Sequence, residues 1–303
     1  MRYFTIFLVF LNFFNHLNAQ KQSNKDFYKL EANYLAQYQK SPNDSILIKQ
    51  LGDLYSLNGK WEEASTFYKK LIGENPKNSI YYLKYGGSLA MLAKEGPKLK
   101  AINYLNQAKR ALDKSELLNP NHLGLNWVQI ELYTKLPGIL GGSFEKAWQY
   151  ANFLEKLSKI DGYFAKAFIL KNQNDLDNFK KYLKKGLNEL SIIDCLNKES
   201  ITENSCNFKN NNINFQIGEA FDLINSNYTE SLKFLNIYLK NHSLVDRYSL
   251  DLVYLYISKI HLKSGNFESA ITNLDYALKI NPNYVEAIQM RKWILKKLDK
   301  QEQ

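Results

Sequence analysis

Few residues in this sequence have the types and spacings that catalysis or metal binding requires. The four histidines, His16, His122, His242 and His261, are scattered along 303 residues, and no two of them follow the His-x-x-x-His spacing of a metal-binding helix. No serine or cysteine lies in a nucleophile motif, and no two carboxylates form the constellation of a general acid and a general base. We therefore expect no enzymatic activity, no metal site and no cofactor.

The two cysteines, Cys195 and Cys206, lie in one asparagine-rich stretch over residues 191–212. In an exported protein they either form a disulfide or remain free thiols, and their spacing allows both. A bridge would close a loop of about a dozen residues and stabilise the fold by somewhat less than ~3 kcal/mol. The stretch has no histidine, so it offers too few ligands for zinc.

The most distinctive loop reads Leu-Pro-Gly-Ile-Leu-Gly-Gly-Ser over residues 136–143. A glycine pair that opens a helix can present backbone N–H groups to an anion, helped by the helix dipole. The loop lacks the lysine and the spacing of a phosphate loop. We favour a tight turn in which Ser143 caps the next helix, and the anion site stays as the alternative.

A 34-residue pattern near the start of the chain recurs near its end. This pattern predicts the helices that carry the histidines, the cysteines and the glycine-rich loop or flank them. The first copy contains Leu51, Gly52, Tyr55, Gly59, Trp61, Ala64, Tyr68 and Pro76. The second copy contains Ile257, Ser258, His261, Gly265, Phe267, Ala270, Leu274, Ala277 and Pro282. Self-similarity of this period is typical of stacked helix pairs.

Apolar residues at helical spacing extend this pattern along most of the chain. They predict a helix over residues 26–40 and a C-terminal capping helix over residues 284–298. Between these, helix pairs are expected over residues 45–78, 82–118, 123–154, 163–190, 213–241 and 251–283.

The repeated residues resemble the tetratricopeptide repeat family, and the resemblance covers most of residues 26–298. It implies an all-α fold, a right-handed superhelical solenoid of about six helix pairs with a C-terminal capping helix. It also implies that the small and aromatic residues of the pattern pack the pairs together; these are Gly52, Tyr55, Ala64, Tyr68, Pro76, Ala270, Ala277 and Pro282.

The same resemblance implies a binding groove on the concave face, which the first helix of each pair forms. The candidate groove residues are Lys49, Asp53, Leu83, Leu252, Leu255, Lys259 and Leu262. Some tetratricopeptide domains hold the terminal carboxylate of a peptide here with lysines and asparagines, but this chain has Asp53 where such a clamp would have asparagine. The leucines and lysine of the last repeat either receive an apolar or acidic segment or pack against the neighbouring pair.

Residues 1–19 have the features of a secretory signal peptide: a basic start at Arg2, a short apolar run and a small residue, Ala19, before Gln20. The apolar run is shorter than the ~20 residues that span a bilayer, although an uncleaved anchor stays as the alternative. We expect N-terminal helical repeats over 20–190, an interruption over 191–212, C-terminal repeats over 213–303, and no membrane span after cleavage.

The formal net charge of +10 raises the question of nucleic-acid or acidic-membrane partners. Only four residues are arginine, and the lysines are spread along the helices beside glutamate and aspartate. Nucleic-acid readers concentrate arginine on one face. We therefore expect neither partner.

Together these features predict an exported, periplasmic or extracellular, non-enzymatic scaffold or adaptor that binds a peptide or protein segment. The alternative is a periplasmic solute-binding or transporter-accessory protein, since the Gly-Gly turn is similar to one in exported bacterial tetratricopeptide proteins, including helpers of tripartite solute transporters. A structural part of an envelope assembly is the third hypothesis.

Overall fold

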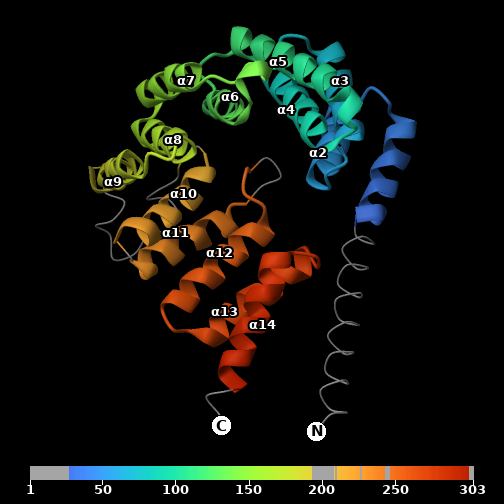
Figure 1. Cartoon of the computed structure of the whole chain (residues 1–303). Coiled ribbons are helices and arrows are strands. Elements are labelled where there is room, and N and C mark those ends of the chain that lie inside the picture. Colours follow the sequence, from blue (N-terminus) through green and yellow to red (C-terminus); the bar gives the residue numbers. More distant parts are fainter. Residues whose placement is uncertain (1–26, 193–207, 209, 226, 243–245, 300–303) are drawn as a thin grey trace. The chain divides into compact units, whose positions relative to one another are not determined.

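The computed structural model describes residues 27–192, 208, 210–225, 227–242 and 246–299, and these residues form helices and connecting turns without a strand (Figure 1). The predicted signal peptide over residues 1–19, both cysteines and most of the asparagine-rich stretch lie outside the described residues. Cys195 and Cys206 as a disulfide therefore stay a prediction.

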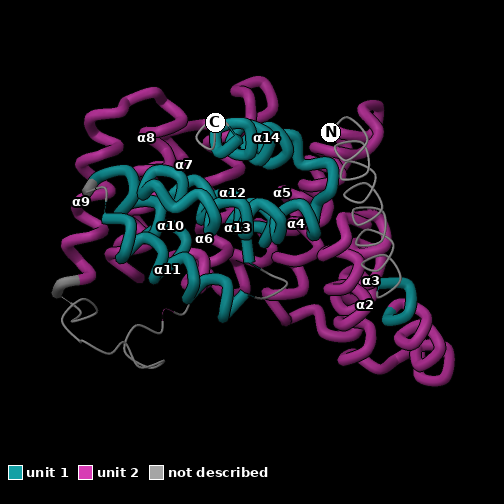
Figure 2. Tube along the Cα trace, turned by 90° about the horizontal axis from the view of Figure 1, so that it is seen from below, with its two compact units in different colours: residues 1–30, 214–303 teal, residues 31–213 magenta. Residues whose placement is uncertain are grey.

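The chain divides into two compact units, which Figure 2 shows in different colours. Unit 2 comprises Glu31–Ile213, and unit 1 comprises Asn214–Gln303 together with Met1–Leu30. A helix over residues 27–40 precedes the helix pairs.

Four helix pairs build unit 2. They are α2 (Ser45–Leu57) with α3 (Trp61–Glu74), α4 (Ser79–Glu95) with α5 (Ala101–Leu118), α6 (Leu123–Lys135) with α7 (Phe144–Leu157), and α8 (Lys159–Asn172) with α9 (Leu176–Ile192). Short 3-10 turns, η1 (Lys98–Lys100) and η2 (Gly138–Leu140), join the helices of the second and third pairs. These are the pairs that the apolar spacing predicts.

Unit 1 holds two further pairs and the capping helix. They are α10 (Asn212–Ala220) with α11 (Tyr228–Lys240), α12 (Leu250–Lys263) with α13 (Phe267–Ile280), and α14 (Val285–Asp299). A π-helical turn, η3 (Phe221–Asn225), continues α10. The predicted all-α architecture of helix pairs with a C-terminal capping helix is confirmed.

Three of the turns between paired helices have the same backbone geometry. Gly59, Asn174 and Gly265 take the left-handed conformation, with φ of 68°, 60° and 80°. In each turn the next amide donates to a carbonyl five residues earlier: Lys60 to Tyr55, Asp175 to Leu170 and Asn266 to His261. This is the Schellman closure of a helix, for which glycine or asparagine has the lowest conformational cost.

Small residues mark where the two helices of a pair approach each other. A Cβ atom on Gly52 of α2 would lie 2.7 Å from Cε1 of Tyr68 on α3. At the corresponding place in the last pair, the hydroxyl of Ser258 donates a 2.9 Å hydrogen bond to the carbonyl of Ala270. Ala64, Ala270 and Ala277 are fully buried, so the cores leave no room for larger side chains at these positions.

No helix in the described part of the chain combines the length and the apolar character that a membrane span requires.

Candidate functional site

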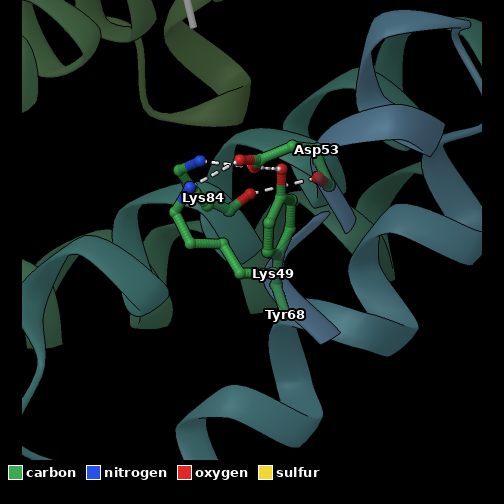
Figure 3. Close-up of polar contacts among 5 residues, drawn as sticks. Lys49, Asp53, Tyr68 and Lys84 are labelled. Carbon is green, nitrogen blue, oxygen red and sulfur yellow. Dashed lines mark hydrogen bonds and ion pairs between the residues drawn. The ribbon is translucent and has the colours of Figure 1, made fainter. Parts of the chain in front are cut away.

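A buried carboxylate links the first helices of two successive pairs in unit 2. Asp53 lies on α2, where only 8% of its surface is exposed, and two lysines approach it (Figure 3). Lys49 comes from the preceding turn of α2, and Lys84 comes from α4. Burial of a charged side chain is costly unless opposite charges and hydrogen bonds compensate it, and this cluster provides both.

Three donors share the two oxygens of the Asp53 carboxylate. The ammonium of Lys49 lies 2.9 Å from Oδ2, and the hydroxyl of Tyr68 donates a 2.7 Å hydrogen bond to Oδ1. The ammonium of Lys84 also donates to Oδ1 and lies 5.4 Å from the centre of the Tyr68 ring. Two cations therefore face one anion, and the cluster carries one net positive charge.

The environment shifts the pKa values of all three buried groups. Burial alone would raise the pKa of Asp53, but the hydrogen bonds and charge of Lys84, with hydrogen bonds from Tyr68 and Lys49, outweigh it and lower this pKa. Burial lowers the pKa of Lys84 despite the attraction of Asp53. Burial, and then the negative charge of Asp53, raises the pKa of Tyr68, so this phenol remains a neutral donor at physiological pH.

Unit 1 contains a second carboxylate of the same kind. Asp222 lies on the π-helical turn η3 and is 6% exposed. The ammonium of Lys263, at the end of α12, lies 2.8 Å and 2.6 Å from its two oxygens, and the hydroxyl of Tyr256 donates to Oδ2 over 3.2 Å. In both units, therefore, a carboxylate at the first helix of one pair binds a lysine from the first helix of the next pair.

The structure separates the predicted groove residues into different environments. Lys49 is half-exposed, with 48% of its side chain accessible, and Leu83 is partly exposed. On α12, Leu252, Lys259 and Leu262 are partly exposed, and Lys259 forms a 2.6 Å ion pair with Glu286 of α14.

Leu255 departs from the predicted groove surface. It is 1% exposed and packs in the core with Ala270, Leu274 and Ala277 of α13. Because its side chain closes the helix pair, Leu255 is a packing residue and does not line a binding surface.

The glycine-rich turn over residues 137–143 satisfies its own backbone donors. The amides of Gly141 and Gly142 donate to the carbonyls of Gly138 and Pro137, and the amide of Ser143 donates to the carbonyl of Tyr133. The Ser143 hydroxyl accepts the amide of Lys146 and caps α7. These amides do not point at a ligand, which leaves the tight turn as the interpretation that fits.

Two of the histidines, His122 and His261, have structural positions on helices. His122 caps α6, where its Nδ1 accepts the amide of Leu125, and burial lowers its pKa. Burial also lowers the pKa of the partly buried His261 on α12. Within the described residues, no group of three or more His, Cys, Asp or Glu side chains is arranged to hold a metal ion.

A pocket of about 410 Å³ lies between α5, α6 and α7 of unit 2. Its lining residues are Glu116, Pro120, Tyr133, Lys146, Gln149, Tyr150 and Phe153. The hydroxyl of Tyr150 donates a 2.8 Å hydrogen bond to Glu116, and the rings of Tyr133 and Tyr150 stack at 5.8 Å. The pocket thus contains one carboxylate, Glu116, and one ammonium, Lys146, and has no excess positive charge that would favour a small anion.

Sequence reasoning placed Asp53 and Tyr68 in separate roles and did not single out Lys84, Asp222, Tyr256 or Lys263. Lys84 lies 31 residues from Asp53, and nothing in a sequence pattern states which face of α4 turns toward α2. The π-helical turn that carries Asp222 replaces α-helical spacing with a wider turn, so periodicity does not locate this residue either.

The sequence profile described as the tetratricopeptide repeat matches residues 50–78, 160–188 and 253–284. Each matched segment contains one of the three left-handed turns, at Gly59, Asn174 and Gly265. No curated protein matches the chain.

Several solved structures are similar to this chain at low sequence identity. A tetratricopeptide repeat protein from Parabacteroides merdae is 14% identical, with 90% of this chain and 94% of that chain covered and a TM-score of 0.48. A thermophilic tetratricopeptide repeat protein from Thermus thermophilus is 13% identical, with 83% and 98% covered and a TM-score of 0.41. YrrB, described as having an unusual peptide-binding site, is 17% identical, with 74% and 97% covered and a TM-score of 0.34. TM-scores of this size carry no argument about function.

Proposed function

The chain is a tetratricopeptide repeat protein, and we propose that it is an exported scaffold without catalytic activity that binds an acidic peptide or protein segment along its first helices. Repeats of this family indicate a protein-interaction scaffold. Export rests on the predicted signal peptide over residues 1–19, and the absence of catalysis rests on the sequence, which lacks a nucleophile motif or an acid–base pair.

The observation that carries the proposal is the excess of positive charge around Asp53. Lys84 and Tyr68 already satisfy Oδ1 of this buried carboxylate. Lys49 binds Oδ2 but leaves about half of its side chain accessible. Its ammonium has donors beyond the one that Asp53 uses, so it is able to receive a carboxylate from a bound segment without losing Asp53.

A crosslinking experiment in the native cell identifies the protein partner. The chain is affinity-purified after crosslinking, and the attached proteins are identified by mass spectrometry. Acidic segments of the captured protein are then synthesised, and their dissociation constants are measured with the wild type and with Lys49→Glu. We expect the charge reversal to weaken binding about tenfold or more, because a repulsive contact replaces a charge-assisted hydrogen bond.

Lys69→Glu is the matched control, since Lys69 is an exposed lysine on α3, the second helix of the same pair. Equal affinities of the wild type and Lys49→Glu for the segment would contradict binding at the first helices. If Lys69→Glu lost as much affinity as Lys49→Glu, the loss would come from the change in net charge and not from a contact of Lys49. Mass spectrometry of the native protein tests export separately, with an N-terminus at Gln20 as the expected result.

The solute-binding alternative has less support. Its anion site depended on the amides of the glycine-rich turn, and those of Gly141, Gly142 and Ser143 are paired internally. The pocket beside Tyr133 and Tyr150 is lined by one carboxylate, Glu116, and one ammonium, Lys146, so it has no excess positive charge for an anion.

A further inference from the structure

Two turns in unit 2 each present an aliphatic side chain almost completely to solvent. Leu99 lies in η1 and is 102% exposed, and Ile139 lies in η2 and is 95% exposed. A proline comes directly before each 3-10 turn, Pro97 before η1 and Pro137 before η2. Isolated apolar residues are common on protein surfaces. The exposed fractions of Leu99 and Ile139 mean that almost nothing covers either side chain. These two protrude from the tips of turns with fixed backbone conformations.

Both turns lie along the first half of α5. Leu99 lies two residues before this helix, and Ile102 in its first turn is 62% exposed. The ammonium of Lys109 on α5 donates a 2.6 Å hydrogen bond to the carbonyl of Leu140, which fixes η2 against the helix. Ile102 and Lys109 are seven residues apart and therefore share one helix face, about 10 Å apart along the axis. The turns η1 and η2 therefore both lie beside α5, and we call the surface that carries Leu99, Ile102 and Ile139 the α5 edge.

Positive charge is concentrated at η1 and along α5, on one part of the α5 edge. Residues 94–110 contain four lysines and one arginine but a single acid, Glu95. Lys98 and Lys100, which flank Leu99, are exposed. At the second turn, Lys135 forms an ion pair with Glu131 and adds no net charge. The lysines of the whole chain are mixed with acids, so the composition argued against an acidic membrane; the folded chain nevertheless concentrates cations at this edge.

We propose that the α5 edge docks onto a lipid bilayer surface that is rich in anionic phospholipid. In this arrangement Leu99, Ile102 and Ile139 enter the boundary between headgroups and acyl chains, and the flanking lysines contact the phosphates. A protein partner would need a separate preformed pocket for each protruding side chain. A fluid bilayer accepts all of them without such pockets. This docking is independent of the scaffold function proposed above.

Vesicle co-sedimentation tests the proposal. The chain is mixed with vesicles of phosphatidylcholine alone or of phosphatidylcholine with phosphatidylglycerol, and the bound fraction is measured. We expect binding to the anionic vesicles only, with a decrease as salt screens the lysines. The double variant Leu99→Ser/Ile139→Ser should bind at least about tenfold more weakly because it loses two inserted side chains. Lys98→Glu/Lys100→Glu should also lose about tenfold or more.

Leu117→Ser is the matched control. Leu117 is 80% exposed on the same helix, but it lies at the opposite end, beside Asp113 and Glu116, so its replacement should leave vesicle binding unchanged. Residues 1–19 contain an apolar run that could itself bind vesicles. Both the full chain and the chain from Gln20 are therefore tested, and only differences between variants of the same form count. Unchanged melting temperatures show that these exposed substitutions leave the fold intact.

Three results would overturn the proposal. The first is a wild type that does not bind anionic vesicles in either form, or that binds neutral vesicles equally well. The second is a Leu99→Ser/Ile139→Ser variant that binds as the wild type does. The third is a wild type that self-associates in light scattering while the double variant does not, because the edge would then be an interface between copies of the chain.

Discussion

The hydroxyl of Tyr68 donates a 2.7 Å hydrogen bond to the carboxylate of Asp53, and the residue that makes room for the tyrosine ring is Gly52, the immediate neighbour of that aspartate. Packing and charge at the crossing of α2 and α3 are therefore coupled. A change in the size of residue 52 displaces the ring whose hydroxyl supports the charge of residue 53.

Replacing Gly52 with alanine should lower the free energy of unfolding by about 1–3 kcal/mol, because the new methyl group would lie 2.7 Å from the Tyr68 ring and overpack the crossing. Urea denaturation measures this change. Gly87→Ala is the control, since no atom lies within 4 Å of a Cβ at this position of α4, and alanine there should stabilise the helix by about 0.5–1 kcal/mol. Equal effects of the two substitutions would contradict the close approach at Gly52.

Replacing Tyr68 with phenylalanine keeps the ring and removes the hydroxyl. Because the lost hydrogen bond goes to a charged group, we expect a destabilisation of about 1.5–3 kcal/mol. Tyr276→Phe alters a tyrosine that is 49% exposed and should change stability by less than about 0.5 kcal/mol. A Tyr68→Phe variant as stable as the wild type would show that the hydroxyl does not support Asp53.

The contribution of Asp53 to the free energy of unfolding should depend on pH and should decrease as the solution becomes acidic. Burial opposes its ionisation, but Lys84, Tyr68 and Lys49 together lower its pKa in the folded chain. This stabilisation is therefore fully present above the pKa of an unfolded aspartate, about 3.9. It is lost as the pH falls through the pKa of Asp53 in the folded chain, which is lower.

Asp53→Asn should accordingly destabilise the chain by about 3 kcal/mol at neutral pH, where Lys84 loses its counter-charge. The difference from the wild type should narrow as the pH falls below about 4. Chemical denaturation over this pH range measures both values, with the exposed Asp113→Asn as the control. A difference that stays constant with pH would rule out the ion pair as its source.

Replacing Ala270 with leucine should overpack the crossing of α12 and α13 in unit 1. Ala270 is fully buried, and its carbonyl accepts the hydroxyl of Ser258 on the facing helix. We expect a loss of about 1–3 kcal/mol, read from the thermal unfolding of the variant. Thr272→Leu, at an exposed position two residues along α13, should remain within about 0.5 kcal/mol of the wild type. A comparable loss there would show that the effect of Ala270→Leu does not come from overpacking of the buried crossing.

Sequence reasoning located the helix pairs because local chemistry determines where these helices end. Gly59 and Gly265 close their helices in the left-handed conformation, and the asparagine–proline steps before Pro76 and Pro282 end the second helices. Asn174 performs the same role as the two glycines. Asparagine tolerates positive φ, so it closes α8 as the two glycines close α2 and α12.

The buried charge pairs cannot be located from the sequence in this way. The contact between Asp53 and Lys84 depends on how α2 and α4 turn toward each other, which packing decides after the helices have formed. Leu255 shows the same limit, since the apolar spacing of α12 allows it to face a groove or a core, and only the contacts with α13 place it in the core. Exposure at the tips of η1 and η2 is likewise a property of the folded chain.

The two lysine–carboxylate links give the order of the repeats a chemical basis. Asp53 and Asp222 each require a lysine on the first helix of the following pair, and Lys84 and Lys263 supply them. The two lysines differ in position, because Lys84 lies in the first half of α4 and Lys263 at the end of α12. A duplicated or exchanged pair would bring a carboxylate without its cation, or a cation without its carboxylate, into a buried contact. The helix pairs of this chain are therefore not interchangeable modules. Their similar shapes would allow one pair to replace another, but the buried charges restrict such an exchange.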